Sequence, residues 1–167
     1  MPQTITRGYK AMVADAKKAI EEIEAQDAVK LAGSSAVVLV DLRDPRELER
    51  DGRIPGAFHC TRGMLEFWVD PGSPYYKPVF TDDKTFILYC QADWRGTLAA
   101  AALGDMGMAN VLHLEGGFGE WRKAASHLET ARRLTGAVDN HPVLADCYRA
   151  MRRYGAADDL WRELREA

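Results

Sequence analysis

The segment TFILYCQADWRGTLAAAALGDMG, residues 85–107, joins an apolar run to an alanine-rich stretch through a short polar loop. Residues 85–90 are apolar without alternation, which is typical of a strand covered on both faces of a parallel sheet. Residues 95–107 predict a helix that ends at Gly107. Open α/β sheets bind ligands where their parallel strands end. The polar loop after Tyr89 is therefore the first place to look for function.

Two other segments have the pattern of buried strands. AVVLVD (36–41) is apolar and β-branched, and NVLHL (110–114) is a shorter apolar run. Helical segments separate these strands from residues 85–90. Strands that alternate with helices predict right-handed crossovers and an open, mostly parallel α/β sheet flanked by helices.

The helices begin at recognisable signals. Residues 44–52 have an N-cap aspartate, a proline at the first helical position, a glutamate three residues after the cap and a final glycine. Residues 115–125 (EGGFGEWRKAA) open a later helix. Residues 9–24 place apolar side chains at helical spacing, which predicts one amphipathic helix. Residues 61–81 contain several prolines and predict irregular structure.

The carboxyl-terminal part reads as two short helices divided at Gly155. Their apolar positions are Leu144, Tyr148 and Met151 in the first helix and Leu160 and Leu164 in the second. This stripe can pack on the helices of the sheet or on a second copy of the chain, as in a homodimer, and the sequence leaves both open. We therefore expect an N-terminal helical segment (1–33), a central domain (34–126) and a C-terminal helical extension (127–167).

The composition is that of one soluble globular domain. The chain has 167 residues, of which 47% are hydrophobic and 28% are charged. Its formal net charge of -3 gives little attraction to nucleic acid. We find neither a secretory signal nor an apolar run of membrane-spanning length. Cys60, Cys90 and Cys147 form an odd, widely spaced set, which fits free thiols in a reducing compartment and hence a cytoplasmic protein.

Cys90 is the strongest candidate for chemistry. It ends a predicted strand, and the loop after it leads directly into a helix. Loop amides, the positive end of the helix dipole and Arg95 would favour a thiolate and an anionic ligand there. The alternative is a free cysteine that only packs in the core, since free cysteine is among the most buried residue types. The position of Arg95 and the strand-loop-helix context favour the functional interpretation.

Three segments together resemble the single-domain rhodanese family of sulfurtransferases. They are VVLVDLRDPREL (37–48), GRIPGAFHCTRGMLEFW (52–68) and ILYCQADWRGTLAAAALGDMGMANVLHLEGGFGEW (87–121), and the resemblance covers residues 34–125. It implies a parallel sheet flanked by helices, and a cysteine that carries sulfane sulfur as a persulfide. The sulfur passes from a donor such as thiosulfate to a thiol or cyanide acceptor, with no metal or organic cofactor. The alternative is a non-catalytic rhodanese-like binding or regulatory module.

The resemblance also assigns roles within the loop. It implies that Cys90 is the catalytic nucleophile and that Arg95 assists donor binding. The residues that cradle the outer sulfur are Gln91, Ala92, Asp93, Trp94, Arg95 and Gly96. Four residues separate Cys90 from Arg95. Related phosphatases and arsenate reductases have a longer Cys-x5-Arg loop that can surround an oxyanion, so the short loop argues for sulfur transfer.

The loop departs from the family at two positions. Asp93 stands where the family commonly has glycine, and Gly96 stands where it commonly has serine. One hypothesis is that the Asp93 carboxylate lies near the anion site and disfavours thiosulfate, so that Asp93→Gly lowers the KM for thiosulfate. The alternative is that Asp93 points to solvent, where its charge is screened.

Other residues have simpler expected roles. We expect Asp41 and Arg43 to brace the fold, His59 to be a hydrogen-bonded structural residue, and Gly116 and Gly117 to form a turn. Cys60 is either a resolving thiol near the site or an inert buried one, and burial is commoner. The irregular segment also carries large apolar and aromatic side chains, which either shape an acceptor pocket or cover the core, with burial favoured. They are Met64, Phe67, Trp68, Tyr75 and Tyr76. The remaining histidines, His113, His127 and His141, lack metal-ligand spacing, and we expect no metal.

Overall fold

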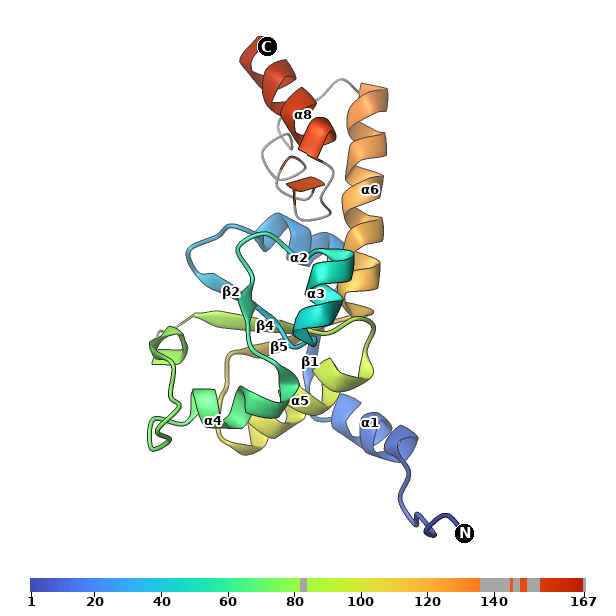
Figure 1. Ribbon diagram of the computed structural model, residues 1–167, viewed down its shortest axis with the longest axis vertical. Helices are drawn as coiled ribbons and strands as arrows, with labels where there is room; N and C mark the ends of the chain where they lie inside the picture. The colour runs from blue at the N-terminus through green and yellow to red at the C-terminus, as the bar shows by residue number, and fades with distance from the viewer. Residues whose placement is uncertain (82–83, 136–144, 146–147, 150–153, 167) are drawn as a thin grey trace.

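Five parallel strands form the centre of the computed structural model, in the order β1-β5-β4-β2-β3 (Figure 1). The structure describes residues 1–81, 84–135, 145, 148–149 and 154–166. The strands are β1 (Glu21–Ile23), β2 (Val37–Asp41), β3 (Phe58–His59), β4 (Thr85–Tyr89) and β5 (Val111–Leu114). The helices are α1 (Tyr9–Lys17), α2 (Ala25–Leu31), α3 (Pro45–Asp51), α4 (Leu65–Val69), α5 (Trp94–Asp105), α6 (Gly117–Thr135) and α8 (Tyr154–Glu166). This architecture confirms the predicted α/β fold.

The three predicted strands lie side by side in the middle of the sheet. Ile87 of β4 pairs with Leu39 of β2 on one side and with Leu112 of β5 on the other. The sheet is covered on both faces, which explains why these strands are apolar without alternation. Phe118 and Trp121 of α6 pack with Tyr89 on one face. Helices α4 and α5 cover the other face (Figure 1).

Helix α3 confirms the sequence signals for its start and end. The Asp44 side chain accepts a hydrogen bond from the Arg46 amide, and the Glu47 carboxylate accepts one from the Asp44 amide at 3.0 Å. This reciprocal pair is a capping box, and it satisfies amides that the first helical turn leaves free. Gly52 ends the helix with φ of 77°, a conformation that favours glycine.

The prediction of one helix over residues 9–24 is wrong. Helix α1 ends at Lys17, and Glu21–Ile23 form the edge strand β1. The register pairs Glu21 with Leu112 and Ile23 with Leu114, and the Glu115 amide donates to the Ile23 carbonyl at 3.0 Å. Pairing with a strand far along the chain overrides the helical spacing of the apolar residues.

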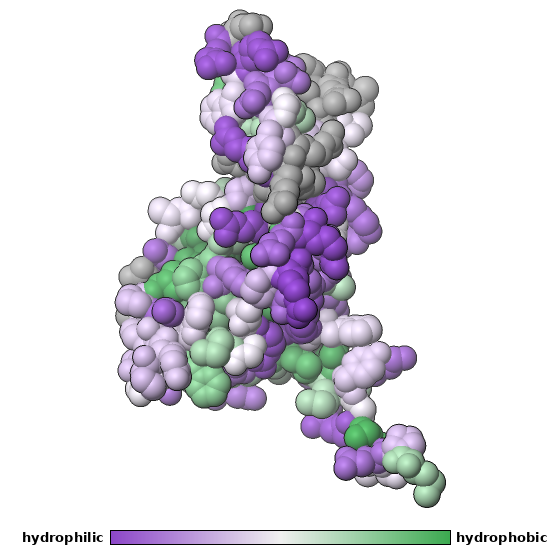
Figure 2. All heavy atoms as spheres, viewed as in Figure 1, coloured by the Kyte–Doolittle hydropathy of each residue, from purple (hydrophilic) through white to green (hydrophobic). Residues whose placement is uncertain are grey.

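The carboxyl-terminal segment packs against α6 of its own chain. Tyr148 and Leu160 are buried with Ala145 and Ala157, and Leu128 of α6 packs against them. Gly155 is the second residue of α8, so the predicted division at this glycine is wrong. Residues 150–153, directly before α8, lie outside the described residues. Leu144 and Met151 lie outside the described residues. In Figure 2 this end of the molecule is mainly hydrophilic on the face shown.

The aromatic segment after β3 mostly serves the core. Trp68 of α4 contacts Phe58 with ring centroids 5.9 Å apart, and Phe58 contacts Phe80 at 5.7 Å. Phe67 and Tyr75 are exposed. The segment is less irregular than predicted, because it contains α4 and two short 3-10 turns, Arg62–Met64 and Pro78–Thr81. Among the described helices, none combines the length and hydrophobicity that crossing a membrane requires.

Candidate active site

Cys90 lies between the end of β4 and the start of α5. The residue is only 2% exposed, and Asp93 and Trp94 follow it at the helix start. Asp93 occupies the N-cap position, but its side chain makes no capping hydrogen bond. The first turn of α5 contains no acidic residue. The positive end of α5 is therefore free to attract an anion beside Cys90.

The first residues of α6 orient the backbone of the Cys90 loop, residues 90–96. The Phe118 amide donates to the Cys90 carbonyl at 2.8 Å, and the Gly119 amide donates to the Gln91 carbonyl at 3.1 Å. In a planar trans peptide the N–H points opposite to the C=O. The N–H groups of Gln91 and Ala92 therefore face away from α6, on the side where a ligand of the loop would lie.

Gly117 makes this arrangement possible. Its φ is 61°, and a Cβ atom at this position would collide with the carbonyl oxygens of Cys90 and Ala92. Gly116 also has a positive φ, of 67°. The two glycines form the predicted turn, and their role is to let α6 approach the Cys90 loop.

Arg95 joins the Cys90 loop to α3. Its Nη1 and Nη2 atoms donate to the two Glu47 carboxylate oxygens at 2.6 and 2.7 Å. Hydrogen bonding from Arg95 lowers the pKa of Glu47. Glu47 in turn raises the pKa of Arg95, and interaction with the Cys90 thiol contributes to that rise. Arg95 thus binds the α3 carboxylate and lies in the first turn of the helix that follows Cys90.

Asp41 and Arg43 brace the fold, as predicted, and also support the loop. Both side chains are fully buried, with Arg43 Nη2 donating to Asp41 Oδ2 at 2.7 Å and to the Gly52 carbonyl at 2.8 Å. Arg43 Nη1 donates to Gln91 Oε1 at 3.3 Å. The guanidinium carbon lies 4.0 Å from the centre of the Phe118 ring. Arg43 therefore ties the first loop residue to the sheet.

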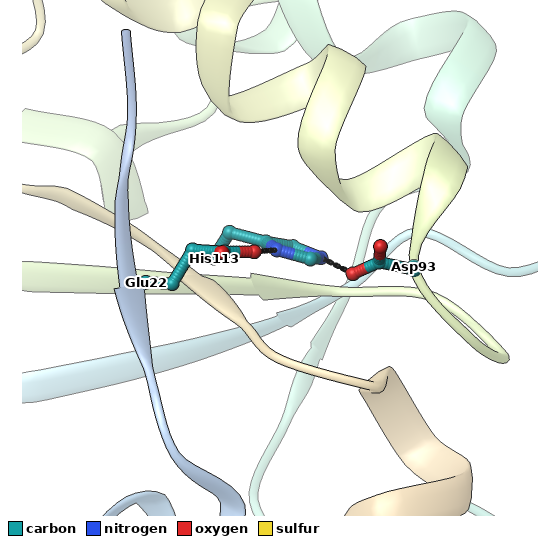
Figure 3. Close-up of side chains that lie close together, drawn as sticks. All are labelled: Glu22, Asp93 and His113. Carbon is teal, nitrogen blue, oxygen red and sulfur yellow. Dashed lines mark hydrogen bonds and ion pairs between the residues drawn. The ribbon is translucent and has the colours of Figure 1, made fainter. Parts of the chain in front are cut away.

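Asp93 belongs to a ring of four charged or polar side chains, three of which, Glu22, Asp93 and His113, are drawn in Figure 3. Its Oδ2 lies 2.9 Å from Lys17 Nζ, and its Oδ1 lies 3.6 Å from Nε2 of the fully buried His113. His113 Nδ1 donates to Glu22 Oε1 at 2.9 Å, and Lys17 Nζ lies 3.3 Å from Glu22 Oε1. The expectation that Asp93 points freely to solvent is therefore wrong. We call Lys17, Glu22, Asp93 and His113 the Asp93 ring.

His113 also accounts for Gly96. A Cβ atom on Gly96 would lie 2.6 Å from both Cδ2 and Nε2 of the imidazole. Real Cβ atoms do not approach other atoms so closely, so a serine here would displace the ring or the helix. Both departures of the loop from the family pattern, at positions 93 and 96, thus have His113 as a neighbour.

The Asp93 ring is better described as an ion-pair network than as a metal site. Three of its members, Glu22, Asp93 and His113, bring potential ligand atoms within 4.8 Å of one another. Figure 3 shows the two carboxylates at opposite edges of the imidazole, so one ion cannot reach both ring nitrogens. The Lys17 ammonium already bridges the carboxylates. Sequence reasoning missed Lys17, Glu22 and His113; the signal was a histidine inside the apolar run NVLHL.

The remaining candidates have structural roles or lie outside the described part. His59 Nε2 donates to the Arg43 carbonyl at 2.8 Å, which makes it a structural residue. Cys60 is fully buried, and burial raises the pKa of its thiol to about 12. These properties favour the inert alternative over a resolving thiol. Trp94 is exposed and contacts Tyr9 of α1, with ring centroids 4.9 Å apart. Cys147 and His141 lie outside the described residues.

Comparison with known proteins decides the family. The sequence model of the rhodanese-like domain family matches residues 24–124. The chain belongs to the rhodanese-like domain family. This rhodanese-like protein is 31% identical over 109 residues to an uncharacterized protein of Synechocystis. That match covers 65% of the chain but 51% of the relative, so the chain spans about half the length of the curated relative.

Solved structures share the fold. A Rhodopseudomonas palustris protein of unknown function, described as a possible tyrosine phosphatase, is 60% identical with a TM-score of 0.72. The match covers 74% of this rhodanese-like protein and 96% of that chain. The human single-domain sulfurtransferase TSTD1 is 21% identical with a TM-score of 0.51, over 61% of this chain and 95% of that one. At that identity the human structure supports the fold alone.

Proposed function

We propose that this rhodanese-like protein is a sulfurtransferase in which Cys90 carries a sulfane sulfur as a persulfide. The observation that carries the proposal is the position of Cys90 just before the start of α5, whose N-cap side chain makes no capping hydrogen bond, with Arg95 in the first turn of that helix. A thiolate and an anionic donor are both stabilised by such a helix end and by a guanidinium. The orientation of the Gln91 and Ala92 amides supports the same conclusion.

The reaction has two displacement steps. The Cys90 thiolate attacks the outer sulfur of thiosulfate and forms a new S–S bond. The bond between the outer sulfur and the sulfonate sulfur breaks, and its electron pair leaves with sulfite. An acceptor such as cyanide then attacks the outer sulfur of the persulfide, leaves as thiocyanate, and regenerates the Cys90 thiolate. Each step exchanges one bond to sulfur for another, so no external oxidant or reductant is needed.

Two features favour sulfur over phosphorus. The loop has four residues between Cys90 and Arg95, which leaves less room for a tetrahedral oxyanion than a five-residue loop. Both terminal nitrogens of Arg95 are bonded to Glu47, whereas clamping a phosphate would use them. The similarity to the R. palustris protein makes phosphate-ester hydrolysis the alternative to test. A non-catalytic binding module is the other alternative, and the presence of Cys90 at the end of β4 counts against it.

Intact-protein mass spectrometry tests the proposal. Wild type, Cys90→Ser and Cys60→Ala are treated with thiosulfate, and thiocyanate release is followed when cyanide is added. We expect one added sulfur in the wild type and in Cys60→Ala, none in Cys90→Ser, and loss of that sulfur as thiocyanate forms.

The same proteins are assayed with p-nitrophenyl phosphate. Cys90-dependent phosphate release without sulfur uptake would replace the proposal with phosphatase activity. Absence of both activities, with thiosulfate and with a polysulfide donor, would favour the binding module.

A further inference from the structure

Helix α1 lies outside the family match but contacts the candidate active site. The match begins at residue 24, whereas α1 comprises Tyr9–Lys17. Tyr9, near its start, contacts Trp94, and Lys17, its last residue, pairs with Asp93. Both partners belong to the Cys90 loop. A helix that the family model does not include therefore contacts two consecutive residues of this loop.

The negative charge of Asp93 is unfavourable for an anionic donor at this loop. An anionic donor such as thiosulfate carries two negative charges, and a carboxylate a few ångströms away would repel it. Lys17 supplies the matching positive charge, with Nζ 2.9 Å from Asp93 Oδ2. The hydrogen bond to Asp93 also raises the pKa of Lys17, so the ammonium persists at neutral pH.

His113 lies between the two carboxylates of the Asp93 ring but makes no hydrogen bond to Asp93. Its Nδ1 donates to Glu22 Oε1 at 2.9 Å, and its Nε2 lacks a hydrogen-bond partner. Nε2 and Asp93 Oδ1, 3.6 Å apart, are both buried without a hydrogen-bond partner. Within the part of the chain that the structure describes, Lys17 is the side chain that donates to Asp93. The imidazole therefore limits where the carboxylate can go, and the ammonium neutralises it.

The Lys17–Asp93 pair faces a cavity. Both residues line a space of about 520 Å³, together with Gly116 of the turn that supports the loop. Glu24 and Glu115, which follow β1 and β5, also line it. The cavity thus opens at the carboxyl edge of the sheet, where ligands of such sheets bind. The lining is mixed in charge, with Glu120 and Lys123 beside these glutamates, and the Lys17–Asp93 pair lies where the Cys90 loop borders the cavity.

We propose that α1 is part of the active site and that Lys17 determines its acceptance of anionic donors by neutralising Asp93. This inference rests on the proposed sulfur transfer. Lys17 is a positioning residue, because it acts through Asp93 and not on the transferred sulfur.

A set of four variants tests this role: Lys17→Met, Lys17→Arg, Asp93→Gly and the double variant Lys17→Met/Asp93→Gly. We expect Lys17→Met to raise the KM for thiosulfate about fivefold or more, with little change in kcat. Lys17→Arg restores a low KM, and the double variant returns it close to the wild-type value because both charges are gone. Lys18→Met is the matched control, since the neighbouring Lys18 pairs with the exposed Asp15.

Alkylation rates give a reading that does not depend on sulfur transfer. Iodoacetate is an anion and iodoacetamide is neutral, so the ratio of their rates with Cys90 reports the charge at the loop. Lys17→Met should lower this ratio several-fold, and Lys18→Met should leave it unchanged. Melting temperatures of all variants show that they are folded.

The outcomes separate the two proposals. If the wild type takes up no sulfur but Lys17→Met still lowers the alkylation ratio, the proposed sulfur transfer is overturned and the role of Lys17 is kept. Normal sulfur transfer with an unchanged KM and ratio in Lys17→Met would overturn the role of Lys17 alone. A Cys90 that reacts with no donor and neither reagent would overturn both.

Discussion

The Cys90 loop is held by charged side chains on two sides, and the sides differ in their contact with water. On the side of β2 the Asp41–Arg43 pair is fully buried and holds Gln91. On the side of β1 the Lys17–Asp93 pair borders a cavity, with side chains 35% and 24% exposed. Buried charges without a partner are far more costly than exposed ones. The first pair therefore serves the stability of the fold, and the second can vary to set the charge that a substrate meets.

Breaking the buried pair should have the largest effect. Arg43→Met leaves the Asp41 carboxylate in the core without its main partner, and we expect the free energy of unfolding to fall by about 3–5 kcal/mol. Denaturation with urea measures this change. Arg46→Met is the control, because Arg46 is exposed and pairs with the half-exposed Asp44, and it should leave stability almost unchanged. Equal losses in the two variants would contradict the claim that burial makes the Asp41–Arg43 pair important for stability.

On the side of the Asp93 ring, shape should matter more than charge for stability. Gly96→Ala places a methyl group against the His113 imidazole, and we expect a loss of about 1–3 kcal/mol. Gly104→Ala in the same helix is the control, since nothing lies within 4 Å of its Cβ position. That variant should be neutral or stabilising.

Whether His113 is the residue that a side chain at position 96 would meet can be tested directly. In a double-mutant cycle of Gly96→Ala with His113→Ala, the losses should not add, with a coupling of roughly 1–2 kcal/mol. Additive losses would mean that His113 does not occupy the space of the missing side chain.

The Glu47–Arg95 pair joins α3 to the start of α5. Breaking this pair should have the smallest effect on stability. Glu47→Gln keeps the capping box but removes the carboxylate, and we expect a loss of roughly 0.5–1 kcal/mol at about pH 7. Arg95 lowers the pKa of Glu47 below its ordinary value of 4.5, so the ionised form stabilises the folded state. This contribution is fully present above pH 4.5 and is lost as the pH falls through the lowered pKa.

Unfolding curves of both proteins over this pH range measure the difference. The gap between wild type and Glu47→Gln should close in acid. A gap that stays constant down to about pH 3 would show that the carboxylate charge contributes nothing.

Much of the fold could be predicted because its signals are local. The runs 36–41, 85–90 and 110–114 are apolar over most of their length, and the capping box of α3 lies within four residues. Strand β1 could not be predicted in this way. Its three residues, Glu21–Ile23, have two exposed acidic side chains, and only pairing with β5 makes them a strand.

The same distinction applies to the candidate site. Cys90 and Arg95 are close in sequence, so their relation to the strand end and the helix start was predictable. Lys17 and Asp93 are far apart in the chain, and nothing local links them. A histidine inside an apolar strand does indicate a buried polar group that needs a partner, but it does not say which residue provides it.

The pairing of β1 with β5 also has a consequence for how the protein assembles. Glu21 pairs with Leu112, so this edge of the sheet closes only when two distant parts of the chain meet. Contacts between distant residues form slowly, because a long loop must close first. During synthesis, α1 emerges well before α5, the helix on which it packs, and before β5. Lys17 is therefore made early but can reach Asp93 only after the later part of the chain has been made.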